Sequence, residues 1–128
     1  MKPKTIKLIG TILTVVVTLI IAGGGIAILV GAKGATKGLI AMGVGNYLTL
    51  LGIMHVAFPL LFAYPKTFKL GLLLLCCYFG GAIATELSHG QKLDAIVPIA
   101  LVWIATFFRD RTIFLPTASS IVNNQKEE

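Results

Sequence analysis

The run LIGTILTVVVTLIIAGGGIAILV, residues 8–30, contains no charged side chain. An α-helix rises about 1.5 Å per residue, so a helix of this length exceeds the roughly 30 Å hydrocarbon core of a bilayer. The run therefore predicts a transmembrane helix. Lys2, Lys4 and Lys7 precede it, as basic residues precede a secretory signal, but the run is longer than the roughly 7 to 15 apolar residues of a signal. Cleavage after residues 22–25 stays open as an alternative.

The composition extends this prediction to the whole chain. Of 128 residues, 56% are hydrophobic and only 12% are charged, and the mean hydropathy is +0.92. Soluble domains carry about 25% charged residues. The net charge of +6 does not indicate nucleic-acid binding, because the lysines and arginines form short clusters between apolar runs. We therefore expect an all-α integral membrane protein whose solvent is the lipid bilayer.

Four apolar runs predict four helices that form a transmembrane bundle over residues 1–115. Their expected ranges are about 7–30, 46–64, 68–87 and 94–110. Tyr47 and Tyr64 bracket the second run as interfacial anchors. The glycine-rich connection 31–46 is expected outside the membrane, with one interfacial turn.

The ends of the chain and of the last helices carry weaker signals. Gly90 suits a helix C-cap, Asp94 suits an N-cap, and Pro98 is tolerated in the first turn of the last helix. This last helix is the shortest of the four. Residues 116–128 are polar and predict a disordered cytoplasmic tail.

The distribution of basic residues predicts the orientation. With four passes, eight of them share one side of the membrane and three the other: Lys2, Lys4, Lys7, Lys66, Lys69, Arg109, Arg111 and Lys126 against Lys33, Lys37 and Lys92. Basic residues favour the cytoplasmic side. We therefore expect an N-in/C-in, multi-pass protein of a bacterial cytoplasmic (inner) membrane.

Small side chains mark the expected helix-packing faces. In the first helix they recur every fourth residue, which lines them along one face and lets another backbone approach closely. In the third helix they form part of the run GGAIAT, residues 80–85. The expected packing residues are Gly10, Thr14, Thr18, Ala22, Gly80, Gly81 and Ala84.

His55 is the polar residue nearest the centre of a predicted span. A charged side chain there costs about 2.5 to 3.5 kcal/mol on insertion scales, so His55 should be neutral and turned toward the bundle. Pro59 lacks an N–H and leaves the His55 carbonyl without its usual donor, which predicts a notch that a polar partner, water or ligand could enter. The alternative is an interhelical hydrogen bond that only assists assembly, with the threonines of the first helix as partners.

Thr85, Glu86 and His89 follow near the outer end of the third helix. In one interpretation Glu86 and His89 form the mouth of a ligand site, with Thr85 at its edge. In the other, Glu86 is a solvated residue at a helix end, and His89 and Lys92 offset its unfavourable position near the C-terminus. Glu86 lies about 12 Å from His55 along the axis, so only water or a ligand could bridge them.

The chain shows few signals for metals or redox-active thiols. Cys76 and Cys77 are adjacent within an apolar run, so they are expected to pack rather than to react. We expect no metal site, and neither a haem-binding pair of histidines nor a nucleotide-binding glycine motif is present.

The stretch GNYLTLLGIMHVAFPLLFAYPKTFKLGLLLLCCYFGGAIATELSHGQKLDAIVPIALVWIATFFRD, residues 45–110, resembles the DoxX-like family of small four-helix membrane proteins. The most specific parts are Pro65 before the turn, the run 80–85, Pro98, and Trp103 with the charged end 109–111. The resemblance implies four transmembrane helices and an association with membrane oxidoreductases, including the quinone-reducing subunit of a thiosulfate-oxidising enzyme. Other relatives of this kind resemble assembly helpers.

The chain departs from the family pattern at two polar positions. Relatives commonly carry histidine where Glu86 stands and an acidic residue near the position of His55, so the two residue types are exchanged here. This exchange places a transferred redox role in doubt.

Two functions from different classes follow. The first is an accessory or subunit of a membrane redox or respiratory system, with an interhelical pocket for a quinone or another lipophile, formed by His55, Pro59, Thr85, Glu86 and His89. The alternative is a non-enzymatic assembly or scaffold protein that packs against partner helices, either of an oxidoreductase subunit or of a second copy. A transporter is a third, weaker hypothesis, because no pair of discontinuous helices is evident. The chain alone is not expected to be a complete oxidoreductase.

Overall fold

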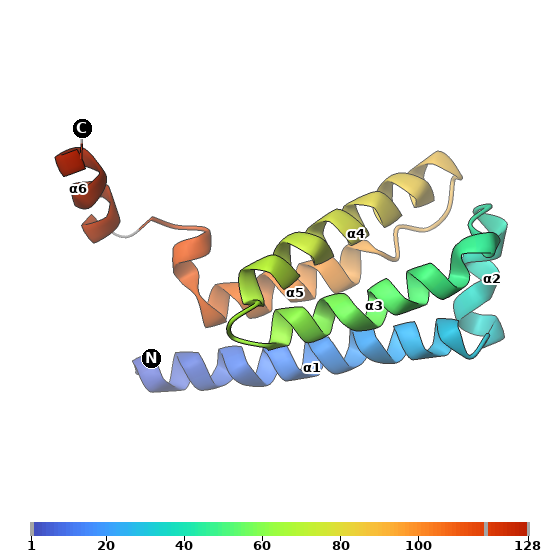
Figure 1. Cartoon of the computed structure of the whole chain (residues 1–128), viewed down its shortest axis with the longest axis horizontal. Helices are drawn as coiled ribbons and strands as arrows, with labels where there is room; N and C mark the ends of the chain where they lie inside the picture. Colours follow the sequence, from blue (N-terminus) through green and yellow to red (C-terminus); the bar gives the residue numbers. More distant parts are fainter. Residues whose placement is uncertain (1, 117, 128) are drawn as a thin grey trace.

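The computed structural model describes residues 2–116 and 118–127, and every regular element in these ranges is helical (Figure 1). The expectation of an all-α protein is confirmed. The elements are α1 (Pro3–Leu29), α2 (Lys33–Ala41), the 3-10 turn η1 (Gly45–Tyr47), α3 (Leu48–Ala63), α4 (Phe68–Ser88), α5 (Ile96–Arg109), the 3-10 turn η2 (Arg111–Ile113) and α6 (Ala118–Glu127).

The four longest helices pack side by side. α1 contacts α3 and α5, and α4 also contacts α3 and α5, so the helices follow the ring order α1, α3, α4, α5. Figure 1 shows that successive members of the chain alternate in direction. We call the end that carries the α3–α4 turn, residues 64–67, the hairpin end, and the opposite end, which carries α2 and η1, the α2 end.

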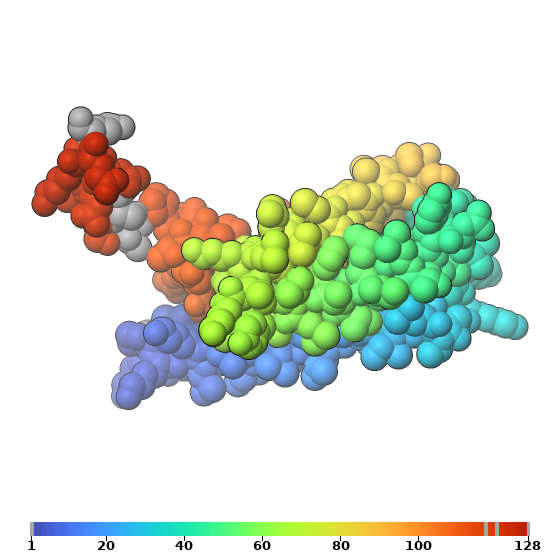
Figure 2. All heavy atoms as spheres, viewed as in Figure 1, coloured from blue at the N-terminus to red at the C-terminus, as the bar shows by residue number. Residues whose placement is uncertain are grey.

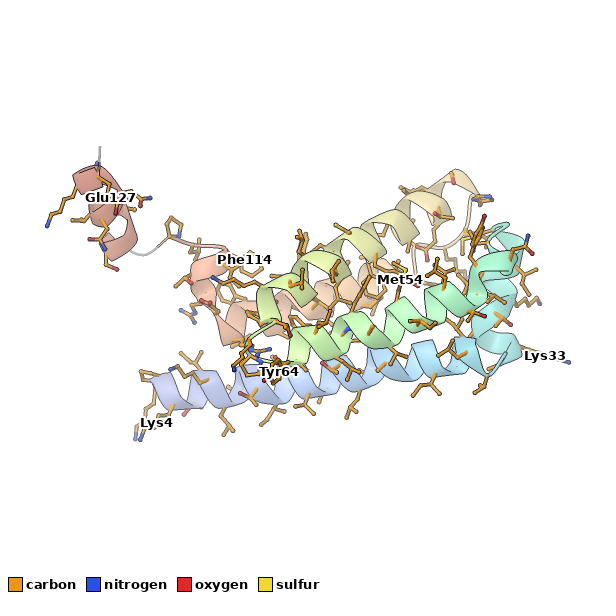
Figure 3. All side chains as sticks on the ribbon, in the orientation of Figure 1. Lys4, Lys33, Met54, Tyr64, Phe114 and Glu127 are labelled. Carbon is orange, nitrogen blue, oxygen red and sulfur yellow. The ribbon has the colours of Figure 1, made fainter. Side chains whose placement is uncertain are left out.

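Three helical stretches are long and apolar enough to cross a membrane: Pro3–Leu29, Gly45–Ala63 and Phe68–Ser88. α5 is apolar but has only 14 residues, which is about 21 Å and shorter than a typical hydrocarbon core. Lys4 and Tyr64 lie toward one end of the bundle and Lys33 at the other (Figure 3).

The connection and the tail contain more helix than the sequence indicated. The connection 31–46 includes the nine-residue helix α2, in which Thr36 is buried and its hydroxyl donates to the carbonyl of Ala32 at 3.0 Å. Residues 118–127 form α6, so the prediction of a disordered tail is wrong for this segment. Figure 2 shows the red α6 segment standing apart from the bundle.

The prediction that Asp94 caps the last helix is also wrong. The N-cap of α5 is Ala95, and no side chain of its own segment caps it. Pro98 lies in the first turn of α5, as expected. Gly90 follows the C-cap of α4 with φ +62°, a conformation that glycine adopts without strain.

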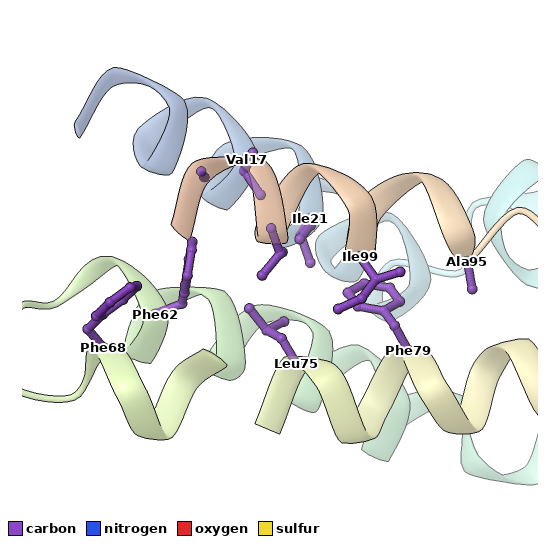
Figure 4. Packing of buried hydrophobic residues seen from close by; sticks show 10 residues of the cluster. Val17, Ile21, Phe62, Phe68, Leu75, Phe79, Ala95 and Ile99 are labelled. Atoms are coloured by element: carbon purple, nitrogen blue, oxygen red, sulfur yellow. The ribbon is translucent and has the colours of Figure 1, made fainter. Parts of the chain in front are cut away.

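The core lies between the four helices. Figure 4 shows the side chains of Ile21, Leu75, Phe79 and Ile99 meeting there from α1, α4 and α5. Phe62 closes the core toward the hairpin end, and it is fully buried, as are Leu75 and Val102.

Two glycines set the closest helix crossings at the hairpin end. A Cβ atom on Gly10 would lie 2.8 Å from the backbone nitrogen of Arg109, so α1 and α5 touch backbone to backbone there. A Cβ atom on Gly71 would overlap the backbone nitrogen of Phe62, so α4 approaches α3 in the same way. The small residues Thr14 and Thr18 are also buried on this face of α1, and Ala22 is half-buried. In contrast, Gly80, Gly81 and Ala84 are exposed on α4.

Candidate functional site

A cavity of about 310 Å³ opens between α3 and α4 at the α2 end. Its apolar wall comes from the α2–η1 segment and α3, and its remaining wall from one face of α4. The apolar residues are Leu39, Met42, Val44, Leu51 and Met54, and the α4 residues are Tyr78, Gly81, Ala82, Thr85 and Glu86. α3 and α4 touch at Gly71, near the turn, and space is left between them further along, where Gly81 has no neighbouring atom within 4 Å of an added Cβ.

His55 is held behind the wall of this cavity by a tyrosine. Its Nδ1 lies 3.1 Å from the hydroxyl of Tyr78, and its ring meets the rings of Tyr78 and Phe79 edge to face at 5.2 and 5.5 Å. The ring is therefore directed at α4. The threonines of α1, which the sequence indicated as partners, do not bond to it, because the Thr14 hydroxyl donates to the Gly10 carbonyl at 2.7 Å and that of Thr18 donates to Pro59 at 3.4 Å.

The glycines of α1 make room for this histidine. A Cβ atom on Gly24 would lie 3.4 Å from Nε2 of His55, and one on Gly25 would lie 3.0 Å from its carbonyl carbon. Larger residues here would push α1 away from α3. Gly24 and Gly25 thus serve a close helix crossing, whereas an added Cβ on Gly23 would meet no atom within 4 Å.

Pro59 does not line the cavity. It is buried against α1, and its carbonyl accepts the hydroxyl proton of Thr18 at 3.4 Å. The Thr18 hydroxyl does not reach the His55 carbonyl, which Pro59 leaves without its usual donor; α1 lies against that carbonyl at Gly25 instead.

Glu86 is buried, with 8% of its surface exposed, so the interpretation of a solvated helix end is wrong. Both of its carboxylate oxygens lie 3.2 Å from the backbone nitrogen of Ala95, which donates to them. Ala95 is the N-cap of α5. This N–H, which has no partner within its own helix, and the positive end of the α5 dipole compensate the carboxylate, a role the sequence had assigned to His89 and Lys92.

His89 lies outside the cavity as the exposed C-cap of α4. Its Nδ1 lies 2.9 Å from the carbonyl of Thr85 and 3.1 Å from the hydroxyl of Ser88, so it completes the end of its own helix. Thr85 does line the cavity, and its hydroxyl donates to the carbonyl of Gly81 at 2.9 Å.

Of the five residues expected at a site, the cavity therefore receives Thr85 and Glu86 directly and His55 through Tyr78. No contact between His55 and Glu86 is recorded in the described ranges, in line with their axial offset. Tyr78 bonds the first and shares the cavity with the second.

Sequence reasoning missed Tyr78 and the apolar wall. The signal for Tyr78 was present: Tyr78, Ala82 and Thr85 are spaced at i, i+4 and i+7 and so share one helix face. A phenol hydroxyl inside an apolar helix also needs a hydrogen-bond partner. The wall formed by residues 39–44 carried no such signal, because it depends on how the connection folds back over α3.

A second charged residue forms hydrogen bonds between helices at the hairpin end. Arg109, the last residue of α5, donates to the carbonyls of Phe62 at 2.7 Å and Ala63 at 3.2 Å, at the C-terminus of α3. Its guanidinium lies 4.1 Å from the ring centroid of Phe68. These contacts satisfy the negative end of the α3 dipole and leave the cation no role in the cavity.

No group of three metal-ligating side chains occurs among residues 2–116 and 118–127. Cys76 accepts a hydrogen bond from Trp103 Nε1 at 3.3 Å, and Cys77 is exposed. The polar groups of the cavity could orient an organic ligand through hydrogen bonds, and their surroundings would favour a lipophile.

In residues 2–116 and 118–127, fold and site thus define an all-helical protein with three helices able to cross a membrane and a small, largely apolar cavity whose lining includes the carboxylate-bearing Glu86. The chain matches no family model, and no curated protein or solved structure is significantly similar to it. The resemblance of residues 45–110 to the DoxX-like family stays a prediction.

Proposed function

We propose that the chain is a multi-pass membrane protein that holds a lipophilic molecule, such as a quinone, in the cavity between α3 and α4. In this proposal it serves as an accessory or subunit of a redox or respiratory system in a bacterial inner membrane. The observation that carries the proposal is the lining of the cavity, in which apolar side chains face polar groups on α4. Its volume of about 310 Å³ lies at the lower end of the range for small-molecule sites.

The lining supports a lipophile over a water-soluble ligand. Five apolar side chains form one wall, and the polar groups gather on α4 at Tyr78, Thr85 and Glu86. A ligand with a polar head and an apolar body matches this division. The two helices that flank the cavity, α3 with η1 and α4, are both apolar enough to lie in lipid, so such a ligand could enter from the bilayer.

The sharpest test uses two adjacent glycines. An added Cβ meets no atom within 4 Å at either Gly80 or Gly81, but only Gly81 lines the cavity. Gly81→Leu should therefore fill the cavity without disturbing the fold, and Gly80→Leu is its matched control. The full chain, purified in mild detergent, should release a stoichiometric lipophile on solvent extraction as wild type and as Gly80→Leu, but not as Gly81→Leu. Equal recovery from both variants would exclude the cavity as the binding site.

The proposed topology has four passes with both termini in the cytoplasm. It is supported by the clustering of Lys2, Lys4, Lys7, Lys66, Lys69, Arg109 and Arg111 near the hairpin end, because basic residues favour the cytoplasmic side. In a Cys76→Ala, Cys77→Ala background, Lys33→Cys should react with a membrane-impermeant maleimide in intact cells, and Lys66→Cys should react only after lysis. Labelling of both positions in intact cells would refute four passes in this orientation.

The alternative is a non-enzymatic assembly or scaffold protein, and one observation favours it. Cys77, Gly80 and Ala84 are exposed along α4 at helical spacing, which would let a partner helix approach closely. Under this alternative, Gly80→Leu should abolish recovery of a partner membrane protein or a second copy, while Gly81→Leu should leave it intact. The same pair of variants thus separates the two functions.

A further inference from the structure

The hydrogen-bond donors in the cavity wall are almost all in use. The hydroxyl proton of Thr85 goes to the carbonyl of Gly81. The backbone N–H groups of Met42 and Val44 donate to carbonyls within their own turn, at 3.0 and 3.1 Å. These groups have no proton left for a ligand, although the oxygen of Thr85 keeps lone pairs that can accept one.

Glu86 adds the strongest acceptor in the wall. A carboxylate offers about four lone-pair sites, and the Ala95 N–H is the one donor recorded for the carboxylate of Glu86. Within residues 2–116 and 118–127, no Lys, Arg or His side chain forms an ion pair with it. The carboxylate therefore retains capacity to accept further hydrogen bonds, and Glu86 lines the cavity.

Tyr78 is the remaining hydrogen-bonding side chain, and its role depends on His55. If Nδ1 carries the ring proton it donates to the tyrosine, whose own proton is then free; in the other tautomer the tyrosine donates and can only accept from a ligand. This pair can thus adjust to a ligand, whereas Thr85 and Glu86 can only accept.

We infer that the cavity selects lipophiles whose polar head donates a hydrogen bond, a hydroxyl or an ammonium group, to the carboxylate of Glu86. This inference rests on the proposed ligand pocket and specifies its ligand. The apolar body lies along Leu51 and Met54, and the head lies at the polar face of α4. Among quinones, the reduced form with its hydroxyl groups satisfies this requirement, while the oxidised form can only accept and would find a donor at Tyr78 alone.

Three ligands of similar size test the inference on the full chain in nanodiscs of neutral phosphatidylcholine. 4-Hexylphenol carries a neutral donor, 4-hexylanisole replaces the hydroxyl proton with a methyl group and can only accept, and 4-hexylbenzylammonium carries a cationic donor. A hydrogen bond to a charged group stabilises enough to expect that at least one donor binds about tenfold or more tighter than the anisole. Tighter binding of the ammonium would identify ion pairing as the main attraction, and tighter binding of the phenol a neutral hydrogen bond.

Glu86→Gln tests whether the carboxylate makes the selection. The amide keeps an oxygen for the Ala95 N–H and adds an NH₂ donor, so the preference for donors over the anisole should fall about tenfold, to near equality. The melting temperature of this variant should stay close to that of the wild type, which separates selection from folding. A preference unchanged in Glu86→Gln would overturn the assignment to Glu86.

The outcomes separate this inference from the proposed function. If all three ligands bind equally and Gly81→Leu abolishes all binding, the pocket stands and the donor preference is refuted. If no ligand binds in a manner sensitive to Gly81→Leu, the pocket itself is refuted.

Discussion

Each end of the bundle has a glycine on α4 and a charged side chain that binds the end of another helix, but the packing between α3 and α4 differs at the two ends. At the hairpin end, Gly71 brings α4 against α3, and Arg109 binds the carbonyls that end α3. At the α2 end, Gly81 faces empty space on the same helix, and Glu86 binds the N–H that precedes α5. Between α3 and α4, the hairpin end is thus closed and the α2 end is hollow. A glycine in an apolar helix can thus either allow a neighbouring backbone to approach, as Gly71 does, or leave open space beside the helix, as Gly81 does.

The largest effect on stability is expected from a substitution at Gly71, where α4 contacts the backbone of α3. Gly71→Leu places a side chain where the backbone of Phe62 lies, so α3 and α4 must separate near their turn. We expect the free energy of unfolding in mixed micelles to fall by about 3 kcal/mol or more, because backbone cannot yield as a side chain does. Gly81→Leu, on the same helix, should change it by less than about 1 kcal/mol, since open space surrounds that position. Equal losses would mean that the two ends do not differ in packing.

The next effect concerns the guanidinium at the hairpin end. Arg109→Ala removes two hydrogen bonds to the end of α3 and the contact with the Phe68 ring, which should lower the free energy of unfolding by about 2 kcal/mol. Arg109→Lys keeps the charge but loses the two-pronged geometry, so it should recover about half of the loss. Full recovery by lysine would show that charge alone, and not the paired hydrogen bonds, stabilises this end.

The sequence was sufficient for the helices because their signals are local. A charge-free run such as 8–30 specifies a helix in lipid wherever the rest of the chain lies, and three helices long enough to cross a membrane are present. Gly10 and Thr14 could be assigned to a packing face because helical periodicity alone puts them together. The residues of that face lie against α5 and within the core of the bundle.

The site was less predictable because it depends on contacts between helices. The environment of Glu86 is set by the N-cap of α5, Ala95, nine residues later. The sequence placed the N-cap at Asp94 and gave no sign of a contact with Glu86. His55 was assigned a direction toward the bundle but the wrong hydrogen-bond partner: α1 faces it with Gly24, which has no side-chain polar group, and α4 supplies the hydroxyl of Tyr78. Periodicity gives the faces of a helix, but not which helix each face meets.

A smaller effect is expected at the cap of the hollow end. Glu86→Ala leaves the buried N–H of Ala95 without an acceptor, which should lower the free energy of unfolding by about 1 kcal/mol. The loss is smaller than for Arg109 because the negative charge that is removed was itself costly to bury. Glu86→Gln should stay within about 0.5 kcal/mol of the wild type, as its amide oxygen can accept the same proton. A larger loss of unfolding free energy in Glu86→Ala than in Arg109→Ala would contradict the expectation that the charged contact at the hairpin end stabilises the fold more.

The smallest effect on stability is expected at the hydrogen-bonded pair of Tyr78 and His55, beside the cavity. Tyr78→Phe keeps the edge-to-face rings and removes only the hydroxyl, so the cost should be about 0.6 kcal/mol, the average for interhelical hydrogen bonds measured in a membrane protein. A double-mutant cycle with His55→Phe, read from the free energy of unfolding, should return a coupling of that size. Additive losses would mean that the hydrogen bond stabilises nothing and that packing alone holds the ring of His55 against α4. Tyr78 lines the cavity, so a ligand could compete with His55 for its hydroxyl. Such competition requires that the hydrogen bond between Tyr78 and His55 be weak.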